Sequence, residues 1–110
     1  MALNSVIVTQ NRERYEETRE RVDRLHDFAK ARRYGFTRAD ATEVEPLYAG
    51  TWRSAGERLF LRDLERLRKR GVGVVKARQG RGSGVEGQPG TPSLYTLEKY
   101  KHLAPDQSDL

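Results

Sequence analysis

The chain has 110 residues, which fits one small domain, and it has no cysteine, which excludes disulfides and thiolate metal sites. No stretch approaches the roughly 20 apolar residues of a membrane span, and the opening residues lack the features of a signal peptide, so we expect a cytoplasmic protein. Its 21 Lys and Arg exceed its 16 Asp and Glu, and this net charge of +5 favours an anionic partner, with nucleic acid as the first candidate.

The first 34 residues combine a β-branched run with a long helical pattern. The run at 3–9 contains Val-Ile-Val and predicts a strand, which would form an N-terminal strand or arm over 1–10. Residues 11–34 contain no Gly or Pro, and their apolar positions recur at spacings of three, four and seven, which predicts one long helix. The apolar stripe of this helix consists of Tyr15, Val22, Leu25, Phe28 and Ala29.

Capping motifs predict two further helices. The TRAD motif at 37–40 is a capping box with Asp in place of Glu, and it starts a helix that runs toward Val44. Pro46 either ends this helix or begins another turn. The SAGE motif at 54–57 matches the capping box well, so a third helix is predicted over 55–70.

The remaining chain predicts a hairpin. Residues 72–77 and 93–97 have strand character, and the segment 79–92 between them is a Gly- and Pro-rich basic loop. Three helices, a strand, a basic loop and a second strand follow the order of a winged helix-turn-helix. We therefore predict an α+β, mainly helical domain over 11–100, with a three-helix core and a β-hairpin wing. A flexible polar tail is expected over 101–110.

The third predicted helix has two different faces. Because each helical residue advances by roughly 100°, Phe60, Leu64 and Leu67 cluster within about 60°. Four cations gather within about 80° on the nearly opposite side. A helix in the DNA major groove needs this division, with apolar contact behind and donors in front for phosphates and base edges. The four cations are Arg58, Arg62, Arg66 and Lys69.

An Arg-rich helix face is often no more than solvated surface. The context of this helix therefore decides between a solvated surface and a DNA-binding face. Its acidic residues stay off the middle of the basic stripe, it follows a helix and a turn, and the wing adds further cations. We therefore predict a double-stranded DNA-binding protein that acts as a small transcriptional regulator. The other predicted contacts are Arg53 and Ser54, to phosphate near the start of the helix, and Lys76, Arg78 and Arg81, from the wing.

The stretch RLFLRDLERL, which begins at Arg58, resembles the recognition helix of bacterial regulators of the WYL-domain and deoxyribose-operon-repressor type families. The helix of these regulators commonly begins with Arg, has Thr or Ser at the second position and an aliphatic residue at the third. Any residue follows at the fourth position, and then come Arg-Asp-Leu and a later Leu. The resemblance implies a winged helix-turn-helix, DNA-facing roles for Arg58 and Arg62, and a structural role for Asp63. Short DNA-binding proteins of actinobacterial phages would fit the same shape. The matching residues are Arg58, Phe60, Arg62, Asp63, Leu64 and Leu67.

Besides the expected lack of a ligand-binding domain after this segment, two features of its residues depart from that family pattern. Leu59 replaces the hydroxyl residue, and we expect it to be exposed, covering the neighbouring turn or touching a thymine methyl group. The segment 46–53 is longer than a tight turn, and its aromatic residues Tyr48 and Trp52 are expected to be lids on the core rather than platforms for base stacking. The main alternative is a protein-interaction module on the same fold, such as a phage protein that binds a host factor. Leu59, Trp52 and the surface of the first helix would then carry the contact. An RNA-binding domain is disfavoured because no strand carries an aromatic platform.

The apolar stripe of the first helix is longer than a small core can cover. A homodimer through helix 11–34 or through the N-terminal strand is therefore a second expected partnership. No catalytic motif stands out: the loop at 79–92 lacks the Gly-Lys-Ser/Thr ending of a phosphate-binding loop, and His26 and His102 lie far apart in sequence. We expect no enzymatic activity, no metal and no cofactor.

Overall fold

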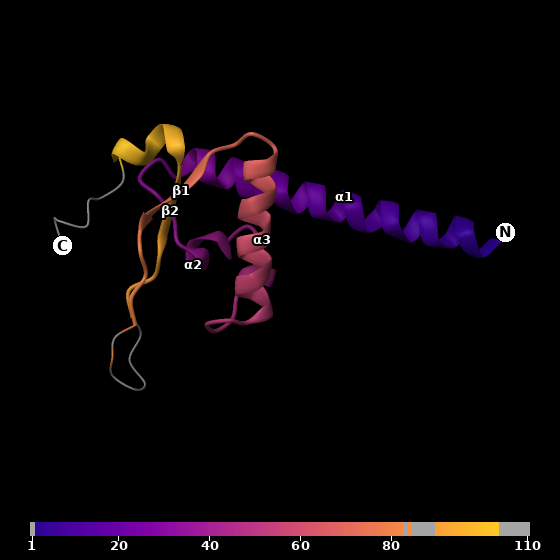
Figure 1. Cartoon of the computed structure of the whole chain (residues 1–110), viewed down its shortest axis with the longest axis horizontal. Helices are drawn as coiled ribbons and strands as arrows, with labels where there is room; N and C mark the ends of the chain where they lie inside the picture. Colours follow the sequence, from indigo (N-terminus) through magenta and orange to yellow (C-terminus); the bar gives the residue numbers. More distant parts are fainter. Residues whose placement is uncertain (1, 83, 85–89, 104–110) are drawn as a thin grey trace.

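The computed structural model of the chain describes residues 2–82, 84 and 90–103, with the backbone only over 2–13. It is a mainly helical α+β domain with a two-stranded antiparallel sheet, as the sequence predicts at this coarse level (Figure 1). The elements, in chain order, are α1 (Ala2–Ala31), α2 (Arg38–Ala41), the 3₁₀ helix η1 (Pro46–Tyr48), α3 (Ala55–Lys69), β1 (Val74–Arg78), β2 (Leu94–Leu97) and the 3₁₀ helix η2 (Glu98–Leu103).

Helix α1 is one continuous helix of 30 residues, so the prediction of an N-terminal strand over 3–9 is wrong. Extending an existing helix costs far less than nucleating one, and no Gly or Pro interrupts the chain before Gly35. The C-terminal half of α1 packs on the other elements, and the N-terminal half projects away from them (Figure 1). Tyr15, which the sequence placed on the apolar stripe, is accordingly 67% exposed.

Helix α2 is a single turn, shorter than the predicted 38–44, and it carries the predicted capping box. The Thr37 hydroxyl accepts a hydrogen bond from the Asp40 N–H at 3.1 Å, and the Asp40 carboxylate accepts one from the Thr37 N–H at 2.9 Å. Pro46 begins a new helical turn in η1, where the Glu45 side chain accepts a hydrogen bond from the Leu47 N–H at 3.3 Å. Two short turns therefore replace one longer helix at the proline.

Helix α3 begins where the SAGE motif predicts it and ends at Lys69, one residue before the predicted end. The Ser54 hydroxyl accepts a hydrogen bond from the Glu57 N–H at 3.3 Å. Gly56 lies in the first turn of α3, directly against the preceding segment. A Cβ at this position would lie 1.9 Å from the carbonyl oxygen of Ala49, so only glycine allows this approach.

Strands β1 and β2 form the predicted antiparallel hairpin, with Val74 opposite Leu97 and a β-bulge between Lys76 and Arg78. Segment 35–37 pairs with the other edge of β2 through Phe36. Part of the predicted loop (83 and 85–89) and part of the predicted tail (104–110) lie outside the described residues. Residues 101–103, which the sequence assigned to the flexible tail, form the end of η2.

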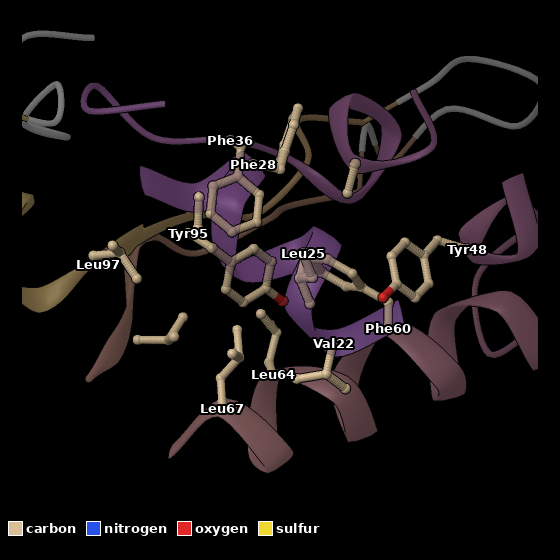
Figure 2. Packing of buried hydrophobic residues seen from close by; sticks show 13 residues of the cluster. Val22, Leu25, Phe28, Phe36, Tyr48, Phe60, Leu64, Leu67, Tyr95 and Leu97 are labelled. Atoms are coloured by element: carbon tan, nitrogen blue, oxygen red, sulfur yellow. The ribbon is translucent and has the colours of Figure 1, made fainter. Parts of the chain in front are cut away.

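The core lies where α1, α3 and the hairpin meet, and Figure 2 shows its side chains. Phe60 is central: its ring makes edge contacts with Tyr48 at 5.3 Å, Tyr95 at 5.4 Å and Phe36 at 6.4 Å between centroids. Aromatic pairs prefer this edge-to-face geometry. The buried cluster comprises Val22, Leu25, Phe28, Ala29, Phe36, Ala41, Tyr48, Phe60, Leu64, Leu67, Val74, Tyr95 and Leu97.

Candidate nucleic-acid interface

Helix α3 divides into a buried face and a cationic face, as its sequence predicts. Its buried residues include Phe60, Leu64 and Leu67, which pack into the core. Three of the four predicted cations are exposed on the opposite side. Within the part of the chain that the structure describes, these three side chains form no hydrogen bond and no ion pair. They are Arg58, Arg62 and Lys69.

Arg66, the fourth predicted cation, has a different environment. Its guanidinium Nη1 donates a hydrogen bond to Asp63 Oδ1 at 2.5 Å, and its side chain is 37% exposed. Asp63 lies one turn earlier on α3 and is fully buried. Arg66 is therefore partly neutralised within the protein, and the outward face offers three unpaired cations rather than four.

Asp63 is the centre of a polar cluster that ties three elements together. Arg21 of α1 donates from Nε to Oδ2 at 2.7 Å and from Nη2 to Oδ1 at 3.2 Å. The hydroxyl of Tyr48, at the end of η1, donates to Oδ2 at 2.8 Å. Together with Arg66, these donors satisfy a carboxylate that burial alone would make costly. We call Asp63, Arg21, Tyr48 and Arg66 the Asp63 cluster.

The pKa values in the Asp63 cluster follow from this arrangement. Burial raises the pKa of the Asp63 carboxyl, but the hydrogen bonds from Arg21, Tyr48 and Arg66 outweigh burial and leave the pKa below its ordinary value. Burial and the bond to Asp63 raise the pKa of the Tyr48 hydroxyl far above its ordinary value. The cluster therefore holds an ionised Asp63 and a neutral Tyr48 at neutral pH.

Sequence reasoning placed Asp63 off the basic stripe without predicting these contacts. The position of Asp63 on the helical wheel could have indicated these contacts, because Asp63 falls within about 40° of Leu67 and 60° of Phe60. A carboxylate inside a buried arc requires a partner. The family resemblance implied a structural role for Asp63, and its position in the cluster agrees with such a role.

The predicted contacts at the start of α3 lie in an exposed turn. Ser54 is the N-cap, and its hydroxyl already accepts a bond from the backbone. Arg53 has a left-handed backbone with φ of 61°, and its Cζ lies 4.2 Å from the centroid of the Trp52 ring. Trp52 is 73% exposed, so the expectation that it is a lid on the core is wrong, whereas Tyr48 is buried as expected.

Leu59 does not have the exposed position that the wheel predicts. It is half-buried and packs against the core cluster. The wheel places Leu59 between Arg66 and Arg70, on the cationic side of α3, so its burial comes from packing that the period of the helix does not predict. Its partial burial agrees with a covering role for Leu59 rather than with a thymine contact.

The three predicted cations of the hairpin differ in their exposure and in their hydrogen-bond partners. Lys76 is exposed, with its Nζ 3.3 Å from Gln79 Oε1. Arg78 is half-buried, and its Nη2 donates to the carbonyl oxygen of Pro92 at 3.0 Å across the hairpin. Arg81 is exposed, at the backbone bridge to Thr91. The hairpin therefore presents Lys76 and Arg81 to solvent, while Arg78 is bound to the opposite strand segment.

Helix α3 and the hairpin lie beside each other. The N-terminal end of α3 and the loop end of the hairpin both lie on the side away from α1, which crosses near their other ends (Figure 1). One partner could therefore contact both elements without meeting α1.

Elsewhere, several arginines are paired with carboxylates. Two of these pairs join α1, or the residue just after it, to the segment between α2 and η1. One joins α1 to the end of α3, and one links successive turns of α3, so positive charge is removed from those surfaces. Surface pairs of this kind add little stability each, but they leave fewer cations free to bind an anionic partner. The pairs are Arg24–Glu45, Arg32–Glu43, Arg70–Asp23 and Arg68–Glu65.

No protein-family model matches this chain, and no curated protein or solved structure matches it either. The resemblance of α3 to bacterial regulators therefore depends on the residues of α3 alone. Among the described residues, no helix combines the length and apolar character that a membrane crossing requires. The same residues bring no three His, Asp or Glu side chains together in a metal-binding arrangement.

Proposed function

We propose that this chain is a double-stranded DNA-binding protein with a winged helix-turn-helix fold, acting as a small transcriptional regulator. The observation that carries the proposal is the outward face of α3. Arg58, Arg62 and Lys69 point away from the core there and, among the described residues, have no carboxylate partner. Unpaired cations on one side of a helix that is packed on its other side are what insertion into a groove requires.

The dimensions and chemistry of DNA fit this face. The major groove is about 12 Å wide and admits one α-helix, and half or more of the protein's hydrogen bonds to DNA go to phosphate and sugar. Arg58 and Arg62 lie four residues apart, on successive turns of α3, so they would reach successive positions along the groove. Arginine also bonds guanine through two donors, which gives the face a means of reading sequence.

The hairpin would serve as the wing of this fold. Three α-helices and the 3₁₀ helix η1 precede it, and it lies beside α3 (Figure 1). Lys76 and Arg81 are exposed on it and would contact the phosphate backbone. Arg66 and Arg78 are held within the protein and would contribute mainly by raising the local positive potential.

Homodimerisation stays a prediction. Only a contact through α1 is now considered, because the residues of the expected N-terminal strand are helical. The half of α1 that projects from the other elements (Figure 1) would supply the contact, and Tyr15 is exposed there. Sedimentation velocity over a range of protein concentrations measures this. A mass that stays at 12.6 kDa up to high concentration would rule the dimer out.

A charge-reversal titration tests the DNA proposal. Fluorescence anisotropy would follow binding of the purified protein to labelled random-sequence duplex DNA at several salt concentrations. The variant Arg58→Glu/Arg62→Glu changes the outward face of α3, and the matched control Arg14→Glu/Arg19→Glu makes the same charge change on exposed positions of α1. We expect micromolar or weaker non-specific binding that falls steeply with salt.

In this titration the α3 variant should lose binding, and the α1 control should keep most of it. Equal losses in both variants would mean that only net charge matters, which contradicts a defined binding face. No binding by the wild-type protein at low salt would overturn the proposal. The protein-interaction alternative would then be favoured, because it leaves the basic face without a role.

A further inference from the structure

The turn between η1 and α3 presents one large aromatic side chain to solvent. Trp52 is 73% exposed, and it is the only tryptophan in the chain. Tyr48, four residues earlier, is fully buried. Sequence alone did not separate these two aromatic residues, but the structure does: one belongs to the core, and the other has no role in it.

The backbone around Trp52 is held by several specific contacts. The Arg38 guanidinium donates to the carbonyl oxygens of Tyr48 at 2.7 Å and of Gly50 at 3.0 Å, so it spans the beginning of the turn. The Ser54 N–H donates to the carbonyl oxygen of Thr51 at 3.1 Å, which closes the turn at its other end. Trp52 is therefore exposed on a turn whose backbone is held in place by hydrogen bonds at both ends.

Arg53 adds a strained conformation to this turn. Its φ of 61° is a left-handed value that non-glycine residues rarely adopt, and such residues persist where the surrounding contacts impose them, often at binding sites. This backbone places the Arg53 guanidinium 4.2 Å from the centroid of the Trp52 ring. The cation covers one face of the indole, so the other face is the one left for a ligand.

The charge around this pair indicates what kind of ligand fits. The sequence has no Asp or Glu from 46 to 56, and Glu57 lies 3.8 Å from Arg38 in an ion pair. A flat apolar surface beside an unopposed guanidinium is complementary to a ligand that alternates apolar and anionic groups. The sugar-phosphate backbone of DNA has this alternation, since each deoxyribose is flanked by phosphates.

We propose that Trp52 and Arg53 form a contact for the sugar-phosphate backbone of duplex DNA at the edge of the groove that α3 enters. The free face of the indole lies against a deoxyribose, and the Arg53 guanidinium bonds the adjacent phosphate. The contact is independent of sequence and fixes the register of α3 in the groove. This inference rests on the proposed function, and it adds an apolar contact to a surface otherwise made of cations.

The single tryptophan makes the contact directly measurable. Acrylamide quenching of Trp52 fluorescence would be compared in the free protein and in its complex with a short random-sequence duplex. We expect the quenching constant to fall at least about twofold in the complex, because a contacted indole is less accessible to the quencher. This measurement uses the wild-type protein, so it does not depend on the folding of any variant.

A substitution series gives the second measurement. Trp52→Ala should weaken duplex binding about fivefold, which corresponds to roughly 1 kcal/mol, without changing the salt dependence. Tyr34→Ala is the matched control, because Tyr34 is 70% exposed but lies in the turn after α1. It should bind like the wild-type protein. Thermal unfolding of both variants would verify that they are folded.

The outcomes separate this inference from the proposed function. Duplex binding with unchanged quenching, and with Trp52→Ala equal to the wild type, would overturn the Trp52 contact and leave the DNA proposal intact. Tighter binding to single strands, with strong loss of Trp52 emission, would indicate base stacking and would also overturn the contact. Absence of any duplex binding would remove the proposed function and this contact together.

Discussion

Arg21 of α1 and Asp63 of α3 are joined by a two-pronged ion pair, with nitrogen–oxygen distances of 2.7 and 3.2 Å, although they lie 42 residues apart. Asp63 is fully buried, so the pair fixes how α1 crosses the helix that carries the proposed DNA-binding face. A buried ion pair is not in itself a strong source of stability. Removing one partner is nevertheless costly, because the other charge is then left buried and unpaired.

We therefore expect Asp63→Asn to lower the free energy of unfolding by about 3 kcal/mol, within the range measured for broken buried pairs. Urea denaturation followed by circular dichroism measures this loss. The matched control is Asp27→Asn, which removes an exposed carboxylate paired with Lys30. The control should change the free energy by less than about 1 kcal/mol. Similar losses in the two variants would contradict the assigned role of the Asp63 cluster.

The same carboxylate predicts a dependence of stability on acid. The pKa of Asp63 is lower in the folded protein than in the unfolded chain, so the unfolded state binds its proton more readily. The stabilisation is present above the unfolded value of about 3.9 and is lost as the pH falls through the lower folded value. Urea denaturation between pH 7 and acid should show a smaller loss for Asp63→Asn than for the wild-type protein. An equal loss of stability in the two proteins as the pH falls would contradict a contribution from the titration of Asp63.

Arg62 and Arg66 lie one turn apart and should respond differently to the same substitution. Arg62→Gln should leave stability unchanged and reduce the slope of log affinity against log salt by about 1, since one phosphate contact is lost. Arg66→Gln should lower the free energy of unfolding by roughly 1–2 kcal/mol, because the Asp63 carboxylate loses a charged donor. Urea denaturation and anisotropy titrations of both variants measure these effects. The reverse pattern would contradict the assigned roles.

Gly56 should be intolerant of a side chain. In Gly56→Ala the new methyl group would meet the Ala49 carbonyl at the start of α3, and we expect a loss of about 3 kcal/mol or more. Gly82→Ala is the control, because a Cβ at Gly82 would meet no atom of the described residues within 4 Å. Thermal unfolding of both variants measures the difference. An unchanged melting temperature for Gly56→Ala would show that the turn can move away from α3.

The sequence predicted those parts of the fold that local chemistry determines. The TRAD and SAGE motifs located the starts of α2 and α3 correctly, because a cap is a contact between residues three apart. The two strands of the hairpin were also found from their β-branched and aromatic residues. The division of α3 into two faces followed from its period alone.

The features that the sequence did not predict depend on distant residues. The run at 3–9 has strand character, but the structure provides no strand beside it among the described residues, and the helix continues through it. The partners of Asp63 come from two other elements, so no local pattern reveals them. The exposure of Trp52 likewise depends on Arg38, which holds the turn from α2. Tertiary contacts decided each of these features.

The contacts of Arg38 and Arg21 have a consequence for how the composition of the chain is interpreted. Each guanidinium uses two of its nitrogen donors on two separate oxygens, a fork that the single ammonium of lysine cannot reproduce. Arginine at these positions acts as a structural cross-link between elements, and its charge is incidental to that role. A charge-conserving change to lysine would therefore weaken the fold at these positions. Net charge thus overstates the charge that this protein can offer to a partner.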